Sequence, residues 1–174
     1  VSLPDLAPTF MEIGGVKPPE GLYGRSLVSL LKSDRSGQIE AERTWVVSGR
    51  ERHVADAREG NLPYPMRALR TKDFTYVRNF APERTPMGDT NKALQAEVIA
   101  SGAIANDTFA GFADMDASPT KQWIVAHRND PNGKWYFEHA FGPRPEEELY
   151  DLRQDPDQVR NVASDSAYAK IKAE

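Results

Sequence analysis

The chain has 174 residues, 28% of them charged, a formal net charge of −4 and an isoelectric point near 5.5. This balance argues against a nucleic-acid partner, because dedicated nucleic-acid-binding domains are usually strongly basic, with a pI above about 9. The absence of cysteine excludes disulfides, thiolate metal sites and a thiol nucleophile. No run approaches the ~20 apolar residues of a membrane-spanning helix, so the sequence predicts no membrane partner.

The first predicted element is a short amphipathic helix over residues 5–13. Asp5 is expected to cap its first turn, since a carboxylate there can accept from unpaired backbone amides. Two glycines at 14 and 15 are typical of a helix end. One apolar stripe runs along this helix, formed by Leu6, Phe10 and Ile13. The sequence starts without Met and ends within another predicted helix, so we expect it to be a piece of a longer protein.

The middle of the chain predicts strands. A second short helix is expected at 27–32 after a capping Ser26, and the segment 44–48 ("TWVVS") is β-branched, aromatic and bounded by polar loops. Residues 64–80 ("YPMRALRTKDFTYVRNF") predict a hairpin that turns at "TKD". Both faces of this hairpin carry apolar and polar side chains. Such a pattern is typical of a sheet covered by a helix on one face and partly covered by another domain on the other.

The rest of the chain predicts helices and one more strand. Helical composition spans residues 91–105, and Ser118 followed by Pro119 favours a helix start before 120–128. Residues 135–142 predict a short aromatic helix, 149–152 a strand and 164–174 a final helix. The predicted fold class is therefore α+β, with a small antiparallel sheet of about four strands packed against helices.

Motifs for metal binding and catalysis are incomplete. The three histidines, His53, His127 and His139, show no short ligand spacing and no H-E-x-x-H. Residues 114–118 ("DMDAS") resemble the start of a calcium loop, but Pro119 and Val125 stand where an EF-hand needs Gly and Glu. The acidic pair is thus interpreted as capping the helix after Ser118. There is no G-x-S-x-G and no Gly-rich phosphate loop.

Basic side chains cluster in the loop 49–53 ("GRERH") and in the hairpin, at Arg67, Arg70 and Arg78. The planar guanidinium fits sulfate, phosphate or carboxylate, which makes anion binding one interpretation. The alternative is solvated charge that pairs with nearby acids such as Glu51, Asp56 and Glu59.

Five segments together resemble, in order, the C-terminal part of a type I (formylglycine-dependent) sulfatase: "SLPDLAPTFMEIGGVKPPEGLYGRSLVSLL", "GRERH", "YPMRALRTKDFTYVRNF", "SPTK" and "EELYDLRQDPDQVRNVA". The most similar branch is that of heparan N-sulfatase (N-sulfoglucosamine sulfohydrolase). The resemblance implies that residues 1–31 are the tail of a large α/β domain related to alkaline phosphatase. Residues 32–174 would be the smaller C-terminal subdomain, with its antiparallel sheet beside a helix.

The resemblance also implies a chemistry that this chain does not carry. The family makes formylglycine in a C/S-x-P-x-R motif and holds calcium with Asp and Asn, but Ser2-Leu3-Pro4 is followed by Asp5 and Leu6, where Arg would be required. Calcium and formylglycine are therefore expected in a missing N-terminal domain, which would be a partner of this chain. We expect no catalytic residue, metal ligand or cofactor here, no activity of the chain alone, and a periplasmic or secreted location by analogy.

The resemblance places a set of side chains near the mouth of the active site, where they would orient a sulfated saccharide. These candidate substrate-binding residues are Arg50, Glu51, Arg52, His53 and Arg67. Arg67 has an alternative role, which is to pair with an acid across the seam between the domains. Two other functions stay open: an independent carbohydrate- or anion-binding module without an enzymatic parent, and a sulfatase-like protein that has lost its nucleophile.

Overall fold

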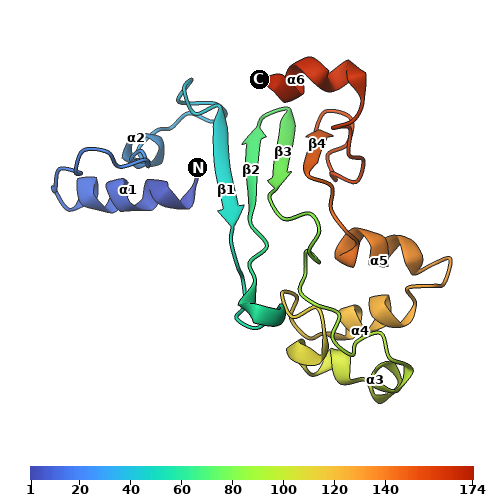
Figure 1. Ribbon diagram of the computed structural model, residues 1–174. Coiled ribbons are helices and arrows are strands. Elements are labelled where there is room, and N and C mark those ends of the chain that lie inside the picture. Colours follow the sequence, from blue (N-terminus) through green and yellow to red (C-terminus); the bar gives the residue numbers. More distant parts are fainter.

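A computed structural model describes residues 1–174, and its centre is a four-stranded antiparallel sheet in the order β1-β2-β3-β4 (Figure 1). The strands are β1 (Trp45–Arg50), β2 (Met66–Thr71), β3 (Phe74–Asn79) and β4 (Glu147–Asp151). Neighbours in the sequence are neighbours in the sheet, and the long connection between β3 and β4 holds a layer of helices. The predicted α+β class with about four strands is confirmed.

The hairpin is formed by β2 and β3, with a two-residue turn at Lys72 and Asp73. The side-chain oxygen of Thr71 accepts a hydrogen bond from the Phe74 amide at 3.0 Å, which closes the turn. The first strand differs from its prediction, since β1 continues two residues beyond Ser48 to Arg50 and pairs with β2 over that length. This extension decides on which side of the sheet Arg50 lies.

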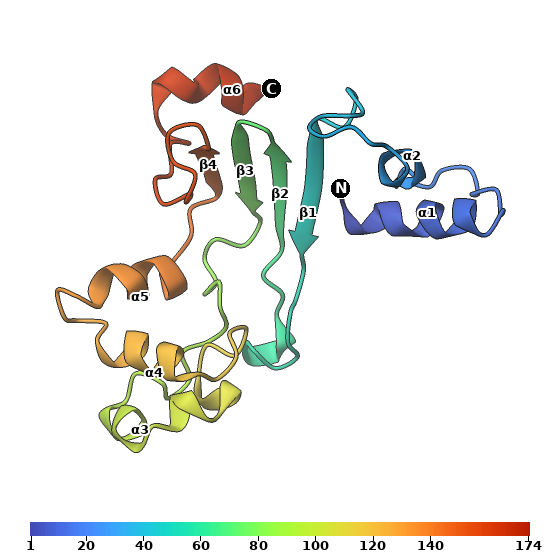
Figure 2. The ribbon, with the colours of Figure 1, turned by 180° about the vertical axis from the view of Figure 1, so that it is seen from behind.

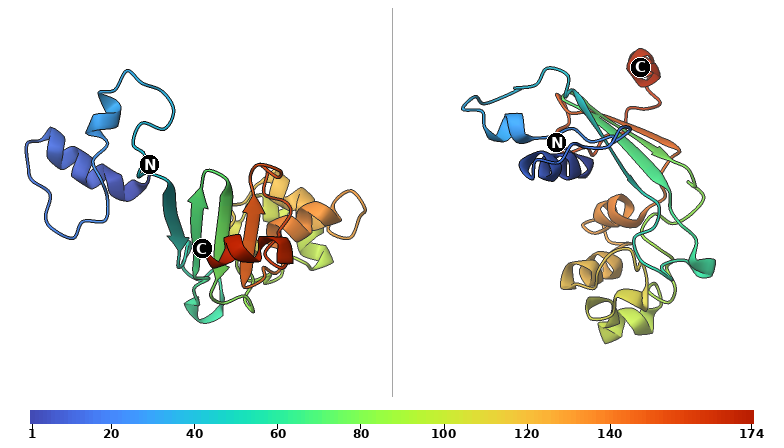
Figure 3. Two further views of the ribbon diagram at one scale, coloured as in Figure 1. Left: turned by 90° about the horizontal axis from the view of Figure 1, so that it is seen from above. Right: turned by 90° about the vertical axis from the view of Figure 1, so that its left-hand side faces the viewer.

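The two faces of the sheet meet different helices. Trp45, Leu69 and Tyr76 share one face, here called the α6 face, with Ile171 of α6 (Ala169–Ala173) beside them. The opposite face, here called the α5 face, is lined in part by side chains of α5 (Lys134–Phe141). In the right-hand view of Figure 3, α6 and α5 lie on opposite sides of the sheet.

A helical layer stands at the end of the sheet near α5. It contains α3 (Ala96–Ser101), α4 (Pro119–Ala126) and α5, around a buried core formed by Ala93, Ile104, Phe112, Val125 and Phe141. The Ser118 side chain accepts from the Lys121 amide at 3.1 Å, so the predicted start of α4 is confirmed. Lys121 itself is fully buried, and its ammonium donates to the carbonyls of Thr108 and Met115.

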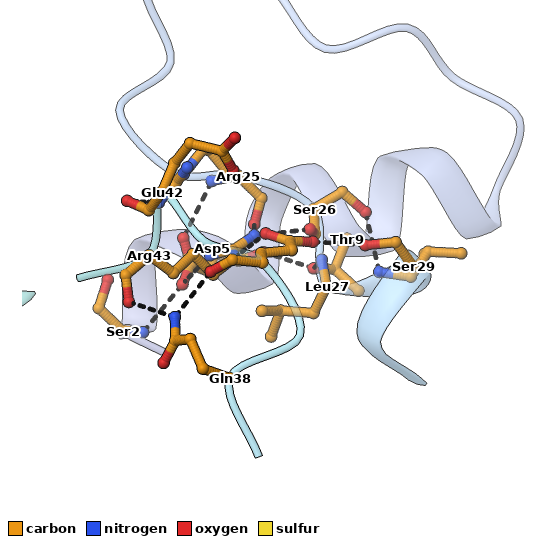
Figure 4. A network of polar contacts seen from close by, with 12 residues as sticks. Ser2, Asp5, Thr9, Arg25, Ser26, Leu27, Ser29, Gln38, Glu42 and Arg43 are labelled. Carbon is orange, nitrogen blue, oxygen red and sulfur yellow. Dashed lines mark hydrogen bonds and ion pairs between the residues drawn. The ribbon is translucent and has the colours of Figure 1, made fainter. Parts of the chain in front are cut away.

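The N-terminal helices α1 (Leu6–Ile13) and α2 (Val28–Leu31) stand to one side of β1 (Figures 1 and 2). Asp5 does not cap α1 as predicted, because a 3-10 turn over Leu3–Asp5 begins the helix earlier. Its buried carboxylate accepts instead from the amides of Ser2 and Arg25 and from the guanidinium of Arg43, as Figure 4 shows. Arg43 also donates to the carbonyls of Arg25 and Ser26, so this network joins α1 and α2 to the segment before β1.

The predicted apolar stripe of α1 exists but has no cover within the chain. Leu6 is 39% exposed, and Phe10 and Ile13 are each 66% exposed. None of the helices has the length and apolar character needed to span a bilayer.

Candidate functional site

The predicted site residues lie at the end of the sheet near the helical layer, where β1 ends and β2 begins. Arg50 is the last residue of β1, Glu51, Arg52 and His53 follow in the loop, and Arg67 is the second residue of β2. The five predicted residues therefore lie in one region of the molecule. The sequence did not show that the sheet divides this region in two.

Arg50 and Arg67 lie on opposite faces. Gly49 pairs with Arg67 and Arg50 pairs with Met66, and directly opposed residues of an antiparallel pair point to the same side. On the α6 face, the Arg67 stem lies over Gly49, where an added Cβ would be 2.7 Å from the Arg67 Cδ. The Arg67 guanidinium forms an exposed ion pair with Glu51 and donates to the Met66 carbonyl at 2.8 Å. Arg67 thus has an acidic partner within the chain.

On the α5 face, Arg50 lines a cavity of about 600 Å³. This cavity, which we call the α5 cavity, is open to solvent. It is lined by residues of the sheet, of α5 and the segment after it, and of the loops before β2, after β3 and after β4. Its polar and aromatic lining includes Arg50, Tyr64, Trp135, His139, Arg144 and Glu148. Its size falls within the ~300–1,000 Å³ typical of small-molecule pockets.

The acidic group of the α5 cavity is already engaged. Glu148 is buried and accepts hydrogen bonds from the Asn79 amide nitrogen at 2.8 Å and from the Tyr150 hydroxyl at 2.5 Å. Burial, together with the Glu148 hydrogen bond, raises the pKa of Tyr150 far above its usual range. Burial and the charge of Glu148 also raise the pKa of Tyr64, so both phenols remain donors near neutral pH.

Two donors in the α5 cavity have no partner. Arg50 donates from Nη2 to the Pro86 carbonyl at 2.9 Å, but its buried Nε–H makes no hydrogen bond. Tyr64 is only 1% exposed, and its buried hydroxyl also has no hydrogen-bond partner. Buried polar groups are almost always paired in native proteins, so these two donors mark an unusual place in the fold.

The loop between β1 and β2 is held by a buried ion pair that the sequence did not reveal. Arg58 donates to the Asp114 carboxylate at 2.8 Å, and the side chains are 2% and 1% exposed. Arg58 also donates to the carbonyls of Thr85 and Pro86. The interpretation of Asp114 as a helix cap is therefore wrong. A pair 56 residues apart leaves no local signal that sequence inspection could have found.

The other candidate side chains have simpler surroundings. Arg52 donates to the Asn61 carbonyl at 3.0 Å within the loop, and His53 is exposed. Arg78 forms ion pairs with Glu146 and Glu147 of the β4 side. Two of the hairpin's arginines therefore have acidic partners within the chain, as the alternative interpretation expected. Arg67 pairs with Glu51, an acid that this interpretation named, whereas the partners of Arg78 lie near β4.

The residues of this chain do not fit a calcium site. No group of three or more histidine, aspartate or glutamate side chains gathers in a metal-binding arrangement. His127 and His139 each use Nδ1 to bond the carbonyl one turn earlier, at Trp123 and Trp135, and each ring stacks on that tryptophan.

Comparison with known proteins relates the chain to sulfatases, although no family model matches it. It is 28% identical over 97% of its length to an ulvan-active sulfatase of Formosa agariphila, and 26% identical over 98% to the human N-sulphoglucosamine sulphohydrolase. These matches span only 26% and 30% of the two relatives. The chain also shares its fold with part of a solved structure determined in complex with its substrate D-glucosamine-2-N,6-O-disulfate, with a TM-score of 0.50 and 18% sequence identity. The match covers 97% of this chain and 21% of the solved one. The predicted resemblance to the C-terminal part of a sulfatase is confirmed.

Proposed function

We propose, from this relationship to sulfatases, that the chain is the C-terminal subdomain of an exported or periplasmic enzyme that hydrolyses sulfate esters or sulfamates on a glycan, heparan-like in character. The observation that carries the proposal is the match over nearly the whole chain to about a quarter of each sulfatase relative. Residues 1–31 would belong to the large domain and 32–174 to the subdomain. The subdomain would bind and orient substrate and pack against the catalytic domain.

The side chains suited to substrate are those at the end of β1 and the start of β2. Arg67 is 47% exposed at its side chain, and its partner Glu51 is 59% exposed. Exposed ion pairs contribute little to stability, ~0–1 kcal/mol, so an incoming sulfate can take the place of Glu51 at small cost. His53, two residues after Glu51 in the chain, is exposed and would be a further donor. Formylglycine and calcium would supply the nucleophile and positive charge elsewhere in the protein.

The uncovered stripe of α1 supports packing against a further domain. Leu6, Phe10 and Ile13 expose apolar surface on one side of a helix that the chain itself leaves bare. Apolar surface of this kind usually marks an interaction site. The remaining three quarters of a sulfatase would be its partner, and the chain alone would release no sulfate.

A second candidate function is an independent module that binds acidic carbohydrate. The α5 cavity favours it, since this cavity is formed entirely by the 174 residues and carries two arginines. The two functions differ in one observation, because only the first requires a C/S-x-P-x-R segment encoded upstream of residue 1.

The substrate-rim role is tested in the full-length protein by steady-state kinetics on a sulfated disaccharide. Arg67→Ala and His53→Ala should each raise KM by at least about fivefold, as loss of a charge-assisted contact implies. Arg160→Ala, an exposed residue after β4, is the matched control and should leave both constants unchanged. If KM and kcat of both rim variants equal those of the unmodified protein, the rim assignment is wrong.

A further inference from the structure

We propose that the α5 cavity is a binding site for an acidic sugar residue, whose carboxylate or sulfate lies between the guanidinium groups of Arg50 and Arg144. The class of sugar rests on the proposed function, whereas the existence of the site rests on the cavity itself. This site lies on the face of the sheet opposite Arg67 and is separate from the predicted rim.

Charge favours an anion in this cavity. Neither Arg50 nor Arg144 forms an ion pair, although most arginines around them do. Arg144 donates to the His139 carbonyl and Arg50 to the Pro86 carbonyl, so each keeps further N–H groups for a ligand. The one carboxylate of the lining, Glu148, is occupied by Asn79 and Tyr150. The lining therefore carries two arginines against one carboxylate, an excess of positive charge, and that carboxylate already accepts two hydrogen bonds.

The unpaired donors point to an acceptor that belongs there. The Nε of Arg50 and the hydroxyl of Tyr64 are both buried without a hydrogen-bond partner, and both residues line the cavity. The Arg58 guanidinium lies 5.5 Å from the centre of the Tyr64 ring and is itself fixed by Asp114, so the phenol is held in place. A ligand oxygen is the kind of partner that would satisfy these donors.

The opening of the cavity suits the apolar face of a sugar ring. Trp135 is 49% exposed, and the imidazole of His139 stacks on it with ring centres 4.0 Å apart. Because His139 bonds the Trp135 carbonyl through Nδ1, its other nitrogen remains to contact a ligand hydroxyl. An aromatic wall, a few directed polar groups and two arginines form the usual composition of a site for a small acidic ligand.

The test is direct binding by isothermal titration to the 174-residue chain, with circular dichroism to check that the unmodified chain and each variant are folded. The probes are a sulfated disaccharide that contains a uronate, the same disaccharide without sulfate, a neutral disaccharide and inorganic sulfate. We expect binding of the first, weaker or equal binding of the second, and none of the neutral sugar. The difference between the first two shows whether sulfate or carboxylate is the anion.

Three variants locate the site. Arg144→Gln should weaken binding by at least about tenfold, the effect of a lost charge-assisted contact. Tyr64→Phe removes only the unpaired hydroxyl, so it should keep the fold and still weaken binding severalfold. Arg35→Gln, an exposed arginine in the loop before β1 that does not line the cavity, is the matched control and should bind as the unmodified chain does.

Three results would overturn the proposal: equal affinity of Arg144→Gln, Tyr64→Phe and the unmodified chain; equal binding of the neutral disaccharide; or inorganic sulfate that binds as tightly as the saccharide. All three results are binding measurements and do not depend on catalytic turnover. Failure here would leave the sulfatase assignment standing, and failure of that assignment would leave a measured saccharide site.

Discussion

Arg50 and Arg67 are one position out of register across the neighbouring strands β1 and β2, and their side chains lie on opposite faces of the sheet. A single saccharide ring at the strand ends therefore meets only one of them. The structure separates the predicted substrate-binding set into an exposed rim with Arg67 and Glu51 on one face and the α5 cavity with Arg50 on the other. Substitutions at the two arginines should have separable effects.

The buried ion pair of Arg58 and Asp114 should dominate the stability of the loop that joins β1 and β2. Arg58→Met leaves the Asp114 carboxylate buried without its cation, and breaking such a pair typically costs about 3–5 kcal/mol of unfolding free energy. Urea denaturation measures this loss. Arg67→Gln, which breaks the exposed pair with Glu51, should cost less than about 1 kcal/mol. Equal losses in the two variants would contradict this account of the loop.

Asp5 should control the attachment of the N-terminal helices. Burial raises the pKa of Asp5. Hydrogen bonds from the amides of Arg25 and Ser2, together with the Arg43 guanidinium, lower it by a larger amount, so the net shift is downward. Asp5→Asn removes the charge that these donors favour. Hydrogen exchange at the Arg25 and Leu27 amides should accelerate at neutral pH while the β3 amides stay protected, and the exposed control Asp34→Asn should change neither. Unchanged exchange at Arg25 in Asp5→Asn would exclude this role.

Acid should weaken the contact between Asp151 of β4 and Tyr168, the residue just before α6. Hydrogen bonds from Arg153, and one from the Tyr168 hydroxyl, lower the pKa of Asp151 to about 2. Because the folded pKa is below the unfolded value of about 3.9, the stabilisation is complete above pH ~4 and is lost as pH falls through about 2. The melting temperature should therefore drop over this range, and less steeply in Asp151→Asn.

The matched control for that experiment is Asp157→Asn, an exposed carboxylate in the following turn. Its melting temperature should follow the unmodified chain across the same pH range. If the melting temperatures of Asp151→Asn and the unmodified chain fall in parallel with pH, protonation of Asp151 is not the cause of the loss of stability in acid.

Features with a local cause could be predicted from the sequence. The start of α4 at Ser118 follows from a side chain that bonds an amide three residues later, and the hairpin follows from two short runs of mixed apolar and polar residues around the polar turn "TKD". Both depend on neighbours within a few residues. The α+β class followed from adding these elements together.

Features that depend on strand register or on contacts between distant residues could not be predicted from the sequence. β1 was expected to end at Ser48, which left Arg50 in a loop, and only its pairing with Met66 fixes the face that Arg50 occupies. The α5 cavity joins residues from β1 to β4 and α5, and the Arg58–Asp114 pair spans 56 residues. No short motif encodes either contact.

The most direct test of the central claim is sulfate release from a sulfated uronate-containing disaccharide, measured in parallel for the full-length protein and for the 174-residue chain. The account predicts steady release by the full-length protein and none by the chain, whose residues offer no nucleophile motif and no metal cluster. Release by the chain alone, or no release by a folded full-length protein, would contradict it.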